Sequence, residues 1–211
     1  MATQSACLNL KVREMTDNTR PTIGFIGLGL MGSAMVNRLL DLGYSVNVLG
    51  NRSRERIEAA IARGAVEQPT AKDIAANSDI VMLCMGTSAQ VESRVFGEDG
   101  VISGAKEGTL VIDFGTSQPE STKHIGAELN KAGVRYMDAP LGRTPSHALD
   151  GLLNIMAAGS AEDFKEVEPV LNDLGENVYH LGELGCGHTL KLINNFFAMT
   201  VAKKGQETCT I

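Results

Sequence analysis

The stretch Gly27-Leu28-Gly29-Leu30-Met31-Gly32 decides the fold of this chain. A short apolar run, Thr22 to Ile26, precedes it, and an amphipathic segment from Leu30 to about Leu42 follows it. Between a strand and a helix, the first glycine permits a tight turn, the second lets the backbone approach a pyrophosphate, and the third lets helix and strand pack closely. The N-terminus of the helix offers unpaired N–H groups to phosphates. We therefore predict that all six residues of the turn bind a dinucleotide.

Strands and helices alternate along the chain as far as Leu181. Apolar or alternating runs predict further strands at residues 44–48, 79–85, 110–114, 134–139, 153–158 and 178–181. Helical patterns occupy residues 53–63, a short segment after Thr70, and residues 119–132 and 160–174. Thr70 with Asp73, and Ser160 with Asp163, have the spacing of a capping box at a helix start. The alternation predicts an α/β fold with a doubly wound, Rossmann-type parallel sheet.

Composition excludes several classes of protein. The chain has 211 residues, of which 43% are hydrophobic, and a formal net charge of −6. Such a chain is globular, and without a basic block it is an unlikely nucleic-acid binder. No apolar run reaches the ~18 residues of a membrane span, and the N-terminal segment lacks the apolar core of a secretory signal. The four cysteines show no metal-site spacing and indicate free thiols. We expect a cytoplasmic protein with no membrane partner, no nucleic-acid partner and no metal.

The residues after the second strand choose between NAD and NADP. Gly50-Asn51-Arg52-Ser53-Arg54 has no acidic residue where an Asp or Glu would bind the ribose 2′-hydroxyl of NAD. Arg52 and Arg54 can donate charge-assisted hydrogen bonds to a 2′-phosphate, while Asn51 and Ser53 add neutral ones. The alternative is that these arginines are solvated residues of the next helix. We favour NADP as the cofactor and keep NAD as the alternative.

A second glycine-opened helix begins within Gly185-Cys186-Gly187-His188-Thr189-Leu190-Lys191. Asn194 and Asn195 follow Lys191 by three and four residues, so the spacing predicts all three side chains on one helix face. A lysine beside two amides can give or take a proton while the amides orient an oxygen-bearing substrate. The alternative is a solvated lysine on an amphipathic helix.

From Gly24 to about Thr200 the chain resembles the β-hydroxyacid dehydrogenase family. The resemblance rests on the glycine turn, on Asp138-Ala139-Pro140, and on the Lys191 helix with Asn195. It implies a nicotinamide-dependent enzyme that reduces a small acidic semialdehyde or oxidises the matching β-hydroxyacid. It further implies that Lys191 is the catalytic acid or base and that Asn195 holds the substrate.

The same resemblance assigns six more residues to the cofactor and substrate sites. Thr116 matches a family residue close to the nicotinamide, and Met85-Gly86 stands where the family usually has Leu-Pro beside the cofactor. Most members bind the substrate carboxylate with a Ser-Gly-Gly segment, whereas this chain has Gly142-Arg143-Thr144 and is similar to the sulfolactaldehyde reductase branch. An arginine there favours a strongly anionic group, such as a sulfonate or a second carboxylate. Alternatively, Arg143 turns outward or pairs with Asp150.

Two other functions remain open from the sequence. One is oxidative decarboxylation as in 6-phosphogluconate dehydrogenase, whose helix also carries glycines, a histidine, the lysine and the asparagine. That enzyme has His-Asn-Gly where this chain has Asn194-Asn195-Phe196. The other is a dinucleotide-binding module without catalysis, although known relatives of that kind have lost the lysine.

We divide the chain into three parts. Residues 1–20 are expected to be a disordered N-terminal extension, residues 21–184 the NAD(P)-binding domain, and residues 185–211 the start of an interdomain helix with a divergent tail. The tail, from Ala202 onwards, loses the helical apolar pattern. In the family an all-helical C-terminal domain follows and builds a homo-oligomer, and we expect the chain to be truncated before that domain.

Overall fold

The computed structural model describes residues 20–50 and 54–208, with side chains as far as Val201. Its main sheet is parallel and has six strands in the order β3-β2-β1-β4-β5-β6. This order confirms the predicted doubly wound, Rossmann-type sheet. The strands are β1 (Ile23–Ile26), β2 (Val46–Leu49), β3 (Val66–Gln68), β4 (Ile80–Leu83), β5 (Leu110–Asp113) and β6 (Arg135–Asp138).

The strands β1, β2, β4 and β5 are buried along their whole length, as strands covered on both faces must be. Two hydrophobic clusters cover the two faces of the sheet. One contains residues of α1 (Leu30–Asp41), α2 (Arg54–Ala62), α6 (Pro145–Leu149) and α7 (Ala161–Leu174). The other contains residues of α3 (Ala71–Ala76), α4 (Ser88–Phe96), the 3₁₀ turn η1 (Val101–Ser103) and α5 (Pro119–Lys131).

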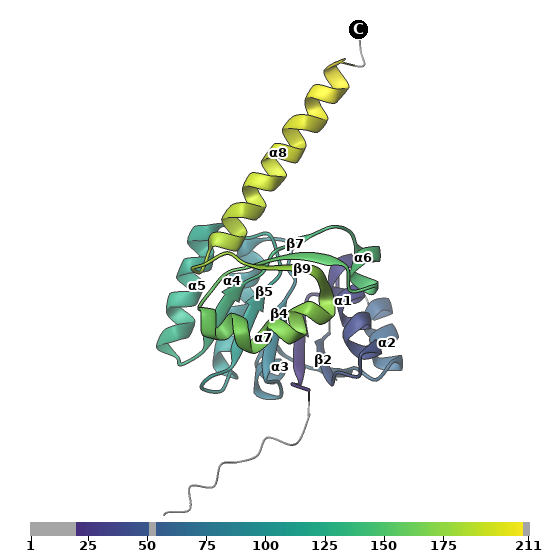
Figure 1. The fold of residues 1–211 in the computed structure, drawn as a ribbon. Coiled ribbons are helices and arrows are strands. Elements are labelled where there is room, and N and C mark those ends of the chain that lie inside the picture. Colours follow the sequence, from purple (N-terminus) through teal and green to yellow (C-terminus); the bar gives the residue numbers. More distant parts are fainter. Residues whose placement is uncertain (1–19, 51–53, 209–211) are drawn as a thin grey trace, which may run out of the picture.

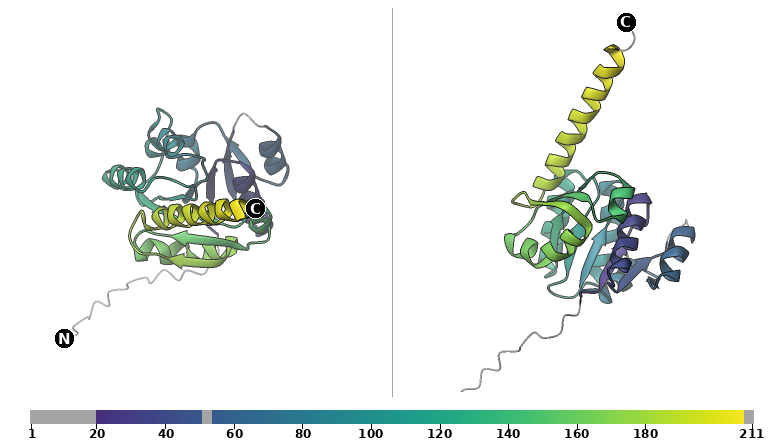
Figure 2. Two further views of the ribbon diagram at one scale, coloured as in Figure 1. Left: turned by 90° about the horizontal axis from the view of Figure 1, so that it is seen from above. Right: turned by 45° about the vertical axis from the view of Figure 1, so that its right-hand side comes forward.

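The last predicted strands do not join the main sheet. They form a separate three-stranded sheet, β7-β8-β9, from β7 (Leu141–Gly142), β8 (Leu153–Ala157) and β9 (Gly175–His180). Figure 2 shows this small sheet and α7 together, in green, on one side of the molecule. The sequence pattern predicts strands but not their partners. It also missed β3, α4, α6 and β7, because most of these elements are too short to show a period.

Both predicted capping signals are confirmed. The Thr70 hydroxyl accepts a hydrogen bond from the Asp73 backbone N–H at 3.0 Å, and the Ser160 hydroxyl accepts one from Asp163 at 3.1 Å. Each bond satisfies an N–H group that the first turn of a helix leaves unpaired. These two short-range interactions explain why α3 and α7 begin where the sequence indicated.

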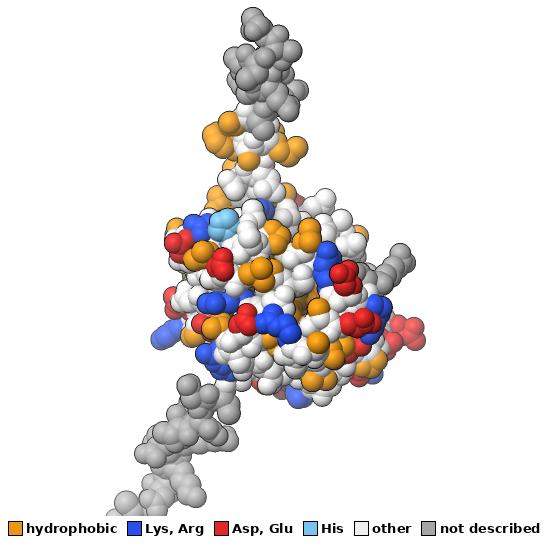
Figure 3. All heavy atoms as spheres, turned by 90° about the vertical axis from the view of Figure 1, so that its right-hand side faces the viewer, with side chains coloured by type: hydrophobic (Ala, Val, Ile, Leu, Met, Phe, Trp, Pro, Cys, Tyr) orange, Lys and Arg blue, Asp and Glu red, His pale blue; other side chains and the backbone are white. Residues whose placement is uncertain are grey.

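The helix α8 (Cys186–Thr208) leaves the body of the protein after its first turns (Figure 1). It continues through Ala202 to Thr208, where the apolar pattern had suggested that the helix was lost. Alanine, lysine, glutamine and glutamate all favour helix without requiring an apolar face. Its outer part carries exposed apolar side chains, and Phe196 and Met199 are each 74% exposed (Figure 3). Within the described residues, neither α8 nor any other helix is long and apolar enough to cross a membrane.

Candidate functional site

The glycine turn has the geometry that a dinucleotide phosphate requires. Gly27 has φ +107°, and a Cβ there would lie 2.3 Å from the carbonyl oxygen of Cys84. A Cβ on Gly32 would lie 2.0 Å from the carbonyl oxygen of Gly27, so helix and turn pack without space for a side chain. A Cβ on Gly29 would meet no atom within 4 Å, and no side chain caps α1 or places an acid in its first turn. The helix N-terminus is therefore open to an anion.

The carboxyl end of β2 differs from the sequence interpretation. Glu67, on the unpredicted strand β3, lies so close to Gly50 that a Cβ there would be 2.4 Å from the Glu67 Oε1 atom. Arg54 donates to both carboxylate oxygens of Glu67, at 2.5 and 3.0 Å, and lies 3.6 Å from Glu58. The bond from Arg54 holds the pKa of Glu67 below its usual value. An acid thus stands beside the end of β2, where the local sequence contains none.

The other predicted residues at this end, Asn51, Arg52 and Ser53, lie outside the described residues. Pairing of β2 with β3 matches Val48 to Glu67 and Leu49 to Gln68, which is how Glu67 reaches Gly50. No local motif around Glu67 could have identified this contact, because it depends on the partner strand.

A pocket of about 290 Å³ opens at the carboxyl ends of β1, β4 and β5. The strand order reverses between β1 and β4, and such a switch point is the usual ligand crevice of a doubly wound sheet. Residues distant in the sequence meet there, and they include six predicted site residues: Met31, Met85, Gly86, Thr116, Arg143 and Lys191. Cys84, Phe114, Gly115 and Leu141 complete the lining.

Lys191 is partly buried in this pocket, and burial lowers the pKa of its ammonium group below the ordinary value. The Cys84 thiol also lines the pocket, but burial raises its pKa to about 12. At neutral pH Cys84 is therefore a protonated thiol and a poor nucleophile. Of the titratable groups that line the pocket, Lys191 is the one suited to proton transfer.

Asn194 and Asn195 lie on different sides of α8. Asn195 is partly buried like Lys191, whereas Asn194 is exposed, and neither lines the pocket. α8 contacts the body of the protein along one side only. Asn195, four residues after Lys191, stays closer to that side than Asn194, which is three residues after it. The predicted common face therefore holds for Lys191 with Asn195 and fails for Asn194.

Arg143 lines the pocket from an unusual backbone position. Its φ is +76°, a left-handed conformation that is rare for a residue with a side chain. The guanidinium donates to the carbonyl oxygen of Leu152 at 2.7 Å and forms an ion pair with Glu176 of β9. The anticipated alternative partner was Asp150, and the observed carboxylate is Glu176.

The flanking residues of Arg143 do not reach the pocket. Gly142 belongs to β7 and pairs with Asn154. Thr144 precedes α6, and its hydroxyl is 2.8 Å from Ser146 Oγ and 2.7 Å from His147 Nδ1. Of the predicted Gly-Arg-Thr segment, the structure therefore brings Arg143 alone to the lining.

Two buried carboxylates hold the loop that carries Thr116 and the start of the helix that carries Lys191. Asp113 ends β5 and accepts hydrogen bonds from the Gly115 N–H and the Ser117 hydroxyl, both at 2.8 Å. Asp138 ends β6 and accepts from the backbone N–H groups of Gly185 and His188, both at 2.7 Å. The sequence interpretation gave Asp138 no role and did not select Asp113. Both end an apolar strand with an acid, which is the signal that could have identified them.

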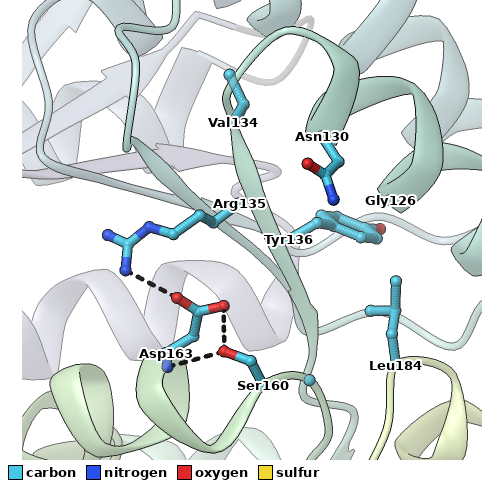
Figure 4. Close-up of a pocket in the computed structure, with 9 residues that line it drawn as sticks. Gly126, Asn130, Val134, Arg135, Tyr136, Ser160, Asp163 and Leu184 are labelled. Carbon is cyan, nitrogen blue, oxygen red and sulfur yellow. Dashed lines mark hydrogen bonds and ion pairs between the residues drawn. The ribbon is translucent and has the colours of Figure 1, made fainter.

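A second hollow of about 220 Å³ lies at the β6 edge and contains no predicted site residue (Figure 4). Its one arginine, Arg135, donates to Asp163 at 2.8 Å and to Glu166 at 2.5 Å. Because Arg135 is paired with two carboxylates, and one of them, Asp163, lines the hollow itself, this hollow offers little to an anionic ligand. No group of three or more His, Cys, Asp or Glu side chains suited to a metal occurs among the residues that the structure describes.

The strand order, the open glycine turn and the crevice at the switch point define a Rossmann-type dinucleotide-binding domain. Residues 22–182 match the family described as the NAD binding domain of 6-phosphogluconate dehydrogenase, and the chain belongs to this family. The predicted membership of the β-hydroxyacid dehydrogenase group within it is confirmed by relatives that carry such names.

Three of these relatives show the range of the group. The chain is 31% identical to 3-sulfolactaldehyde reductase of Escherichia coli, over 90% of this chain and 63% of that protein. A 3-hydroxyisobutyrate dehydrogenase structure from Mycobacterium tuberculosis, with L-serine, matches with a TM-score of 0.78 and 27% identity, over 84% of this chain and 60% of that one. An imine reductase from Myxococcus stipitatus in complex with NADP+ matches with a TM-score of 0.78 and 27% identity, over 88% and 63%. The chain thus spans about 60% of the length of the relatives that it matches.

Proposed function

We propose that this chain supplies the cofactor site and the proton donor of an oxidoreductase that interconverts a small β-hydroxyacid, or its sulfonate analogue, and the matching semialdehyde. The observation that carries the proposal is the pocket in which Lys191 meets Thr116, Met85 and the start of α1. Named relatives that act on hydroxyacids and on 3-sulfolactaldehyde support the same chemistry.

The residues present fit a dinucleotide. The open space above Gly29 and the uncapped start of α1 suit a pyrophosphate, whose charge the helix N-terminus stabilises. A bound reduced nicotinamide would supply the hydride for reduction of a carbonyl. Thr116, Met85 and Gly86 line the part of the pocket between the turn and Lys191, and so would shape the space for the reacting groups.

Lys191 would donate the proton that the carbonyl oxygen needs during reduction. Negative charge grows on that oxygen in the transition state, where an ammonium group both stabilises it and protonates it. In the oxidative direction the neutral amine would take the proton back. The lowered pKa of Lys191 makes this exchange easier near neutral pH than for an exposed lysine.

The substrate would be a small anion. Arg143 is the cationic side chain beside Lys191 in the pocket lining, and a sulfonate or carboxylate can replace Glu176 as its partner. This replacement would place the acidic end of the substrate at Arg143 and the carbonyl group near Lys191. The neutral substrates of a simple alcohol dehydrogenase would leave Arg143 paired with Glu176.

We favour NADP over NAD because Arg52 and Arg54 follow β2. Solved relatives hold NADP+ or NAD+, which supports a nicotinamide dinucleotide as the cofactor, so the preference for NADP rests on these arginines. Arg54 forms an ion pair with Glu67, so the two arginines would have different roles at the cofactor. Arg52 would provide the main charged contact to a 2′-phosphate, and Arg54 would keep Glu67 from repelling it.

The test is a calorimetric titration of the purified chain with NADPH and NADH, followed by turnover assays with 3-sulfolactaldehyde, 3-hydroxyisobutyrate and 6-phosphogluconate. Cofactor consumption with the first or second compound supports the proposal. Release of carbon dioxide from 6-phosphogluconate would replace it with oxidative decarboxylation. Slow turnover still supports the proposal, so the assays are run at high protein concentration; tight cofactor binding without even a single turnover of any compound, in the presence of an intact Lys191, would favour a non-catalytic binding module.

A further inference from the structure

His188 is fully buried on the first turn of α8, and the proposed chemistry does not use it. Its Nδ1 atom is 2.7 Å from the hydroxyl of Thr122 on α5. Its Nε2 atom has no hydrogen-bond partner among the described residues, although it lies 3.7 Å from Asp113 Oδ2. A buried polar atom left in this way costs free energy, so its retention calls for a reason.

The ring stands between the two carboxylates that organise the site. Asp113 and Asp138 are matched residues on the neighbouring strands β5 and β6. His188 Nε2 approaches Asp113, and its Nδ1 is 3.7 Å from Asp138 Oδ2, the atom that also accepts the His188 backbone N–H. His188 thus lies against two elements. One is the loop after Asp113, which carries Thr116, and the other is Asp138, which caps the start of α8, the helix that carries Lys191.

The glycines that precede His188 allow the start of α8 to approach Asp138 closely. Gly185 has φ +94°, and a Cβ on Gly187 would lie 2.3 Å from the carbonyl oxygen of Met156 and 2.8 Å from Asp138 Oδ2. A side chain at Gly187 would push the first turn of α8 off the carboxylate. The segment Gly185-Cys186-Gly187-His188 therefore lets the start of α8 pack closely against Asp138, and its last residue, His188, lies near Asp113.

The protonation state suits a neutral link. Burial lowers the pKa of His188 and raises the pKa of both Asp113 and Asp138. A neutral ring carries one proton; on Nε2 that proton would point to Asp113, and Nδ1 would face the Thr122 hydroxyl, which is also 3.1 Å from the carbonyl oxygen of Gln118. In the reverse tautomer the Nδ1 proton would point to the Thr122 hydroxyl, and the ring would still lie between the two carboxylates.

We propose that His188 is a positioning residue that ties the start of α8 to the Asp113 loop and so fixes Lys191 relative to Thr116. The proposal rests on the function proposed for Lys191. His188 and Lys191 are separated by one helical turn, so a shift of the ring is passed directly to the lysine. A displacement of about 1 Å at a proton donor can cost on the order of 10²-fold in rate.

The experiment compares His188→Leu, His188→Gln and His188→Asn in the same chain. Leucine fills the space without a polar atom. Glutamine can place an amide N–H near the position of Nε2, and asparagine near that of Nδ1. The exposed His124 on α5 provides the matched control, His124→Leu. Three quantities are measured: the pKa of Lys191 by NMR of the ¹³C-methylated lysine, the NADPH dissociation constant by calorimetry, and kcat.

We expect His188→Leu to move the Lys191 pKa back toward its ordinary value and to lower kcat by about tenfold or more, while the NADPH dissociation constant stays the same. Glutamine should restore both the pKa and most of kcat, and asparagine should restore less. Equal behaviour of leucine and glutamine would reduce His188 to a space-filling residue and overturn the proposal. So would an unchanged Lys191 pKa in His188→Leu, or loss of NADPH binding together with the lysine effect.

These measurements distinguish a failure of the His188 proposal from a failure of the proposed function. The Lys191 pKa and the cofactor affinity are measured without any substrate, so a positive result stands even where turnover is absent. Thr122→Val offers a second, milder variant that removes the hydroxyl from Nδ1 and keeps the side-chain shape. It should shift the Lys191 pKa in the same direction by less, and no shift at all would contradict the role of the ring.

Discussion

In the proposed function, Lys191 is the residue on which the chemistry of the pocket depends. Because burial lowers its pKa, the ammonium form is lost at a lower pH than the ~10.4 of a free lysine. Reduction needs that form, so its rate should fall as pH rises through the lowered pKa, while oxidation, which needs the amine, should rise. Lys191→Ala should lose this pH limb and on the order of 10²-fold in kcat.

Lys191→Arg is the control for charge alone. Arginine keeps the positive charge but does not give up its proton in this range, so the alkaline limb should leave the accessible pH window. Rate–pH profiles of the three forms check the assignment. Near-normal kcat in Lys191→Ala would show that another group, or water, protonates the substrate.

We expect the choice of cofactor to depend on residues at the end of β2. We expect Arg52→Ala to weaken NADPH binding while leaving NADH almost unaffected, since each charged hydrogen bond contributes about 1.5–3 kcal/mol. Glu67→Gln should strengthen NADPH binding, because the carboxylate beside Gly50 is removed and Arg54 is released from its pair. Dissociation constants for both cofactors decide the matter, and equal values in the parent chain would reject the NADP preference.

Arg143 should determine the charge of the substrate. Arg143→Ser is expected to raise KM for the best anionic substrate far more than it lowers kcat, because the contact exists in ground and transition states alike. Glu176→Gln removes the competing carboxylate and should lower KM for the same compound. If the substrate profile of Arg143→Ser equals that of the parent, the guanidinium serves only its ion pair with Glu176 and the Leu152 carbonyl.

At the scale of the elements, two glycines of the β1–α1 turn have different expected roles: Gly32 in helix packing and Gly29 in cofactor binding. Gly32→Ala would press a methyl group against the carbonyl oxygen of Gly27, so we expect a loss of about 1–3 kcal/mol in the free energy of unfolding. Gly29→Ala points its methyl group into open space where a pyrophosphate would lie. It should therefore weaken cofactor binding with little loss of stability beyond the change at the helix N-cap.

Urea unfolding and calorimetric titration of the two variants measure these effects side by side. Retained NADPH affinity in Gly29→Ala would show that the phosphates do not sit over this glycine. An unfolding free energy of Gly32→Ala equal to that of the parent would show that α1 can move away from β1 at no cost.

At the scale of the whole molecule, α8 is the exposed part. Beyond its first turns, the exposed apolar residues Ile193, Phe196, Phe197 and Met199 have no described neighbour that covers them. Exposed apolar surface of this size favours association. We expect the 211-residue chain to bind NADPH, to self-associate through α8, and to turn over poorly, because the helix that carries Lys191 is held only at its start.

Phe196→Ser with Phe197→Ser tests this expectation. The double variant should sediment as a smaller species than the parent and should bind NADPH equally well, because the glycine turn lies apart from these residues. Sedimentation velocity, calorimetry and turnover are measured on the same samples. Ordinary dehydrogenase rates from a monomer would show that Lys191 needs no further support from α8 packing.

Much of this fold could be predicted from local patterns. Apolar runs identified the central strands, capping pairs located α3 and α7, and Gly27, Gly29 and Gly32 marked the phosphate turn, since each depends on residues adjacent in the chain. The pocket was predicted in parts: Thr116, Met85 and Lys191 were selected separately, and the structure brings them together. The separate β7-β8-β9 sheet was not predicted, because a strand pattern does not name its partner.

The sequence by itself determined the fold class and the glycine turn between β1 and α1, and it selected the lysine that lines the pocket, because backbone conformation and helix starts are set over a few neighbouring residues. Only the tertiary structure decided which charges meet. Glu67 reaches Gly50 across a strand pair, Glu176 takes Arg143, and Asp113 and Asp138 enclose His188. Such contacts join residues far apart in the chain, and their strength depends on burial and distance, neither of which local sequence specifies.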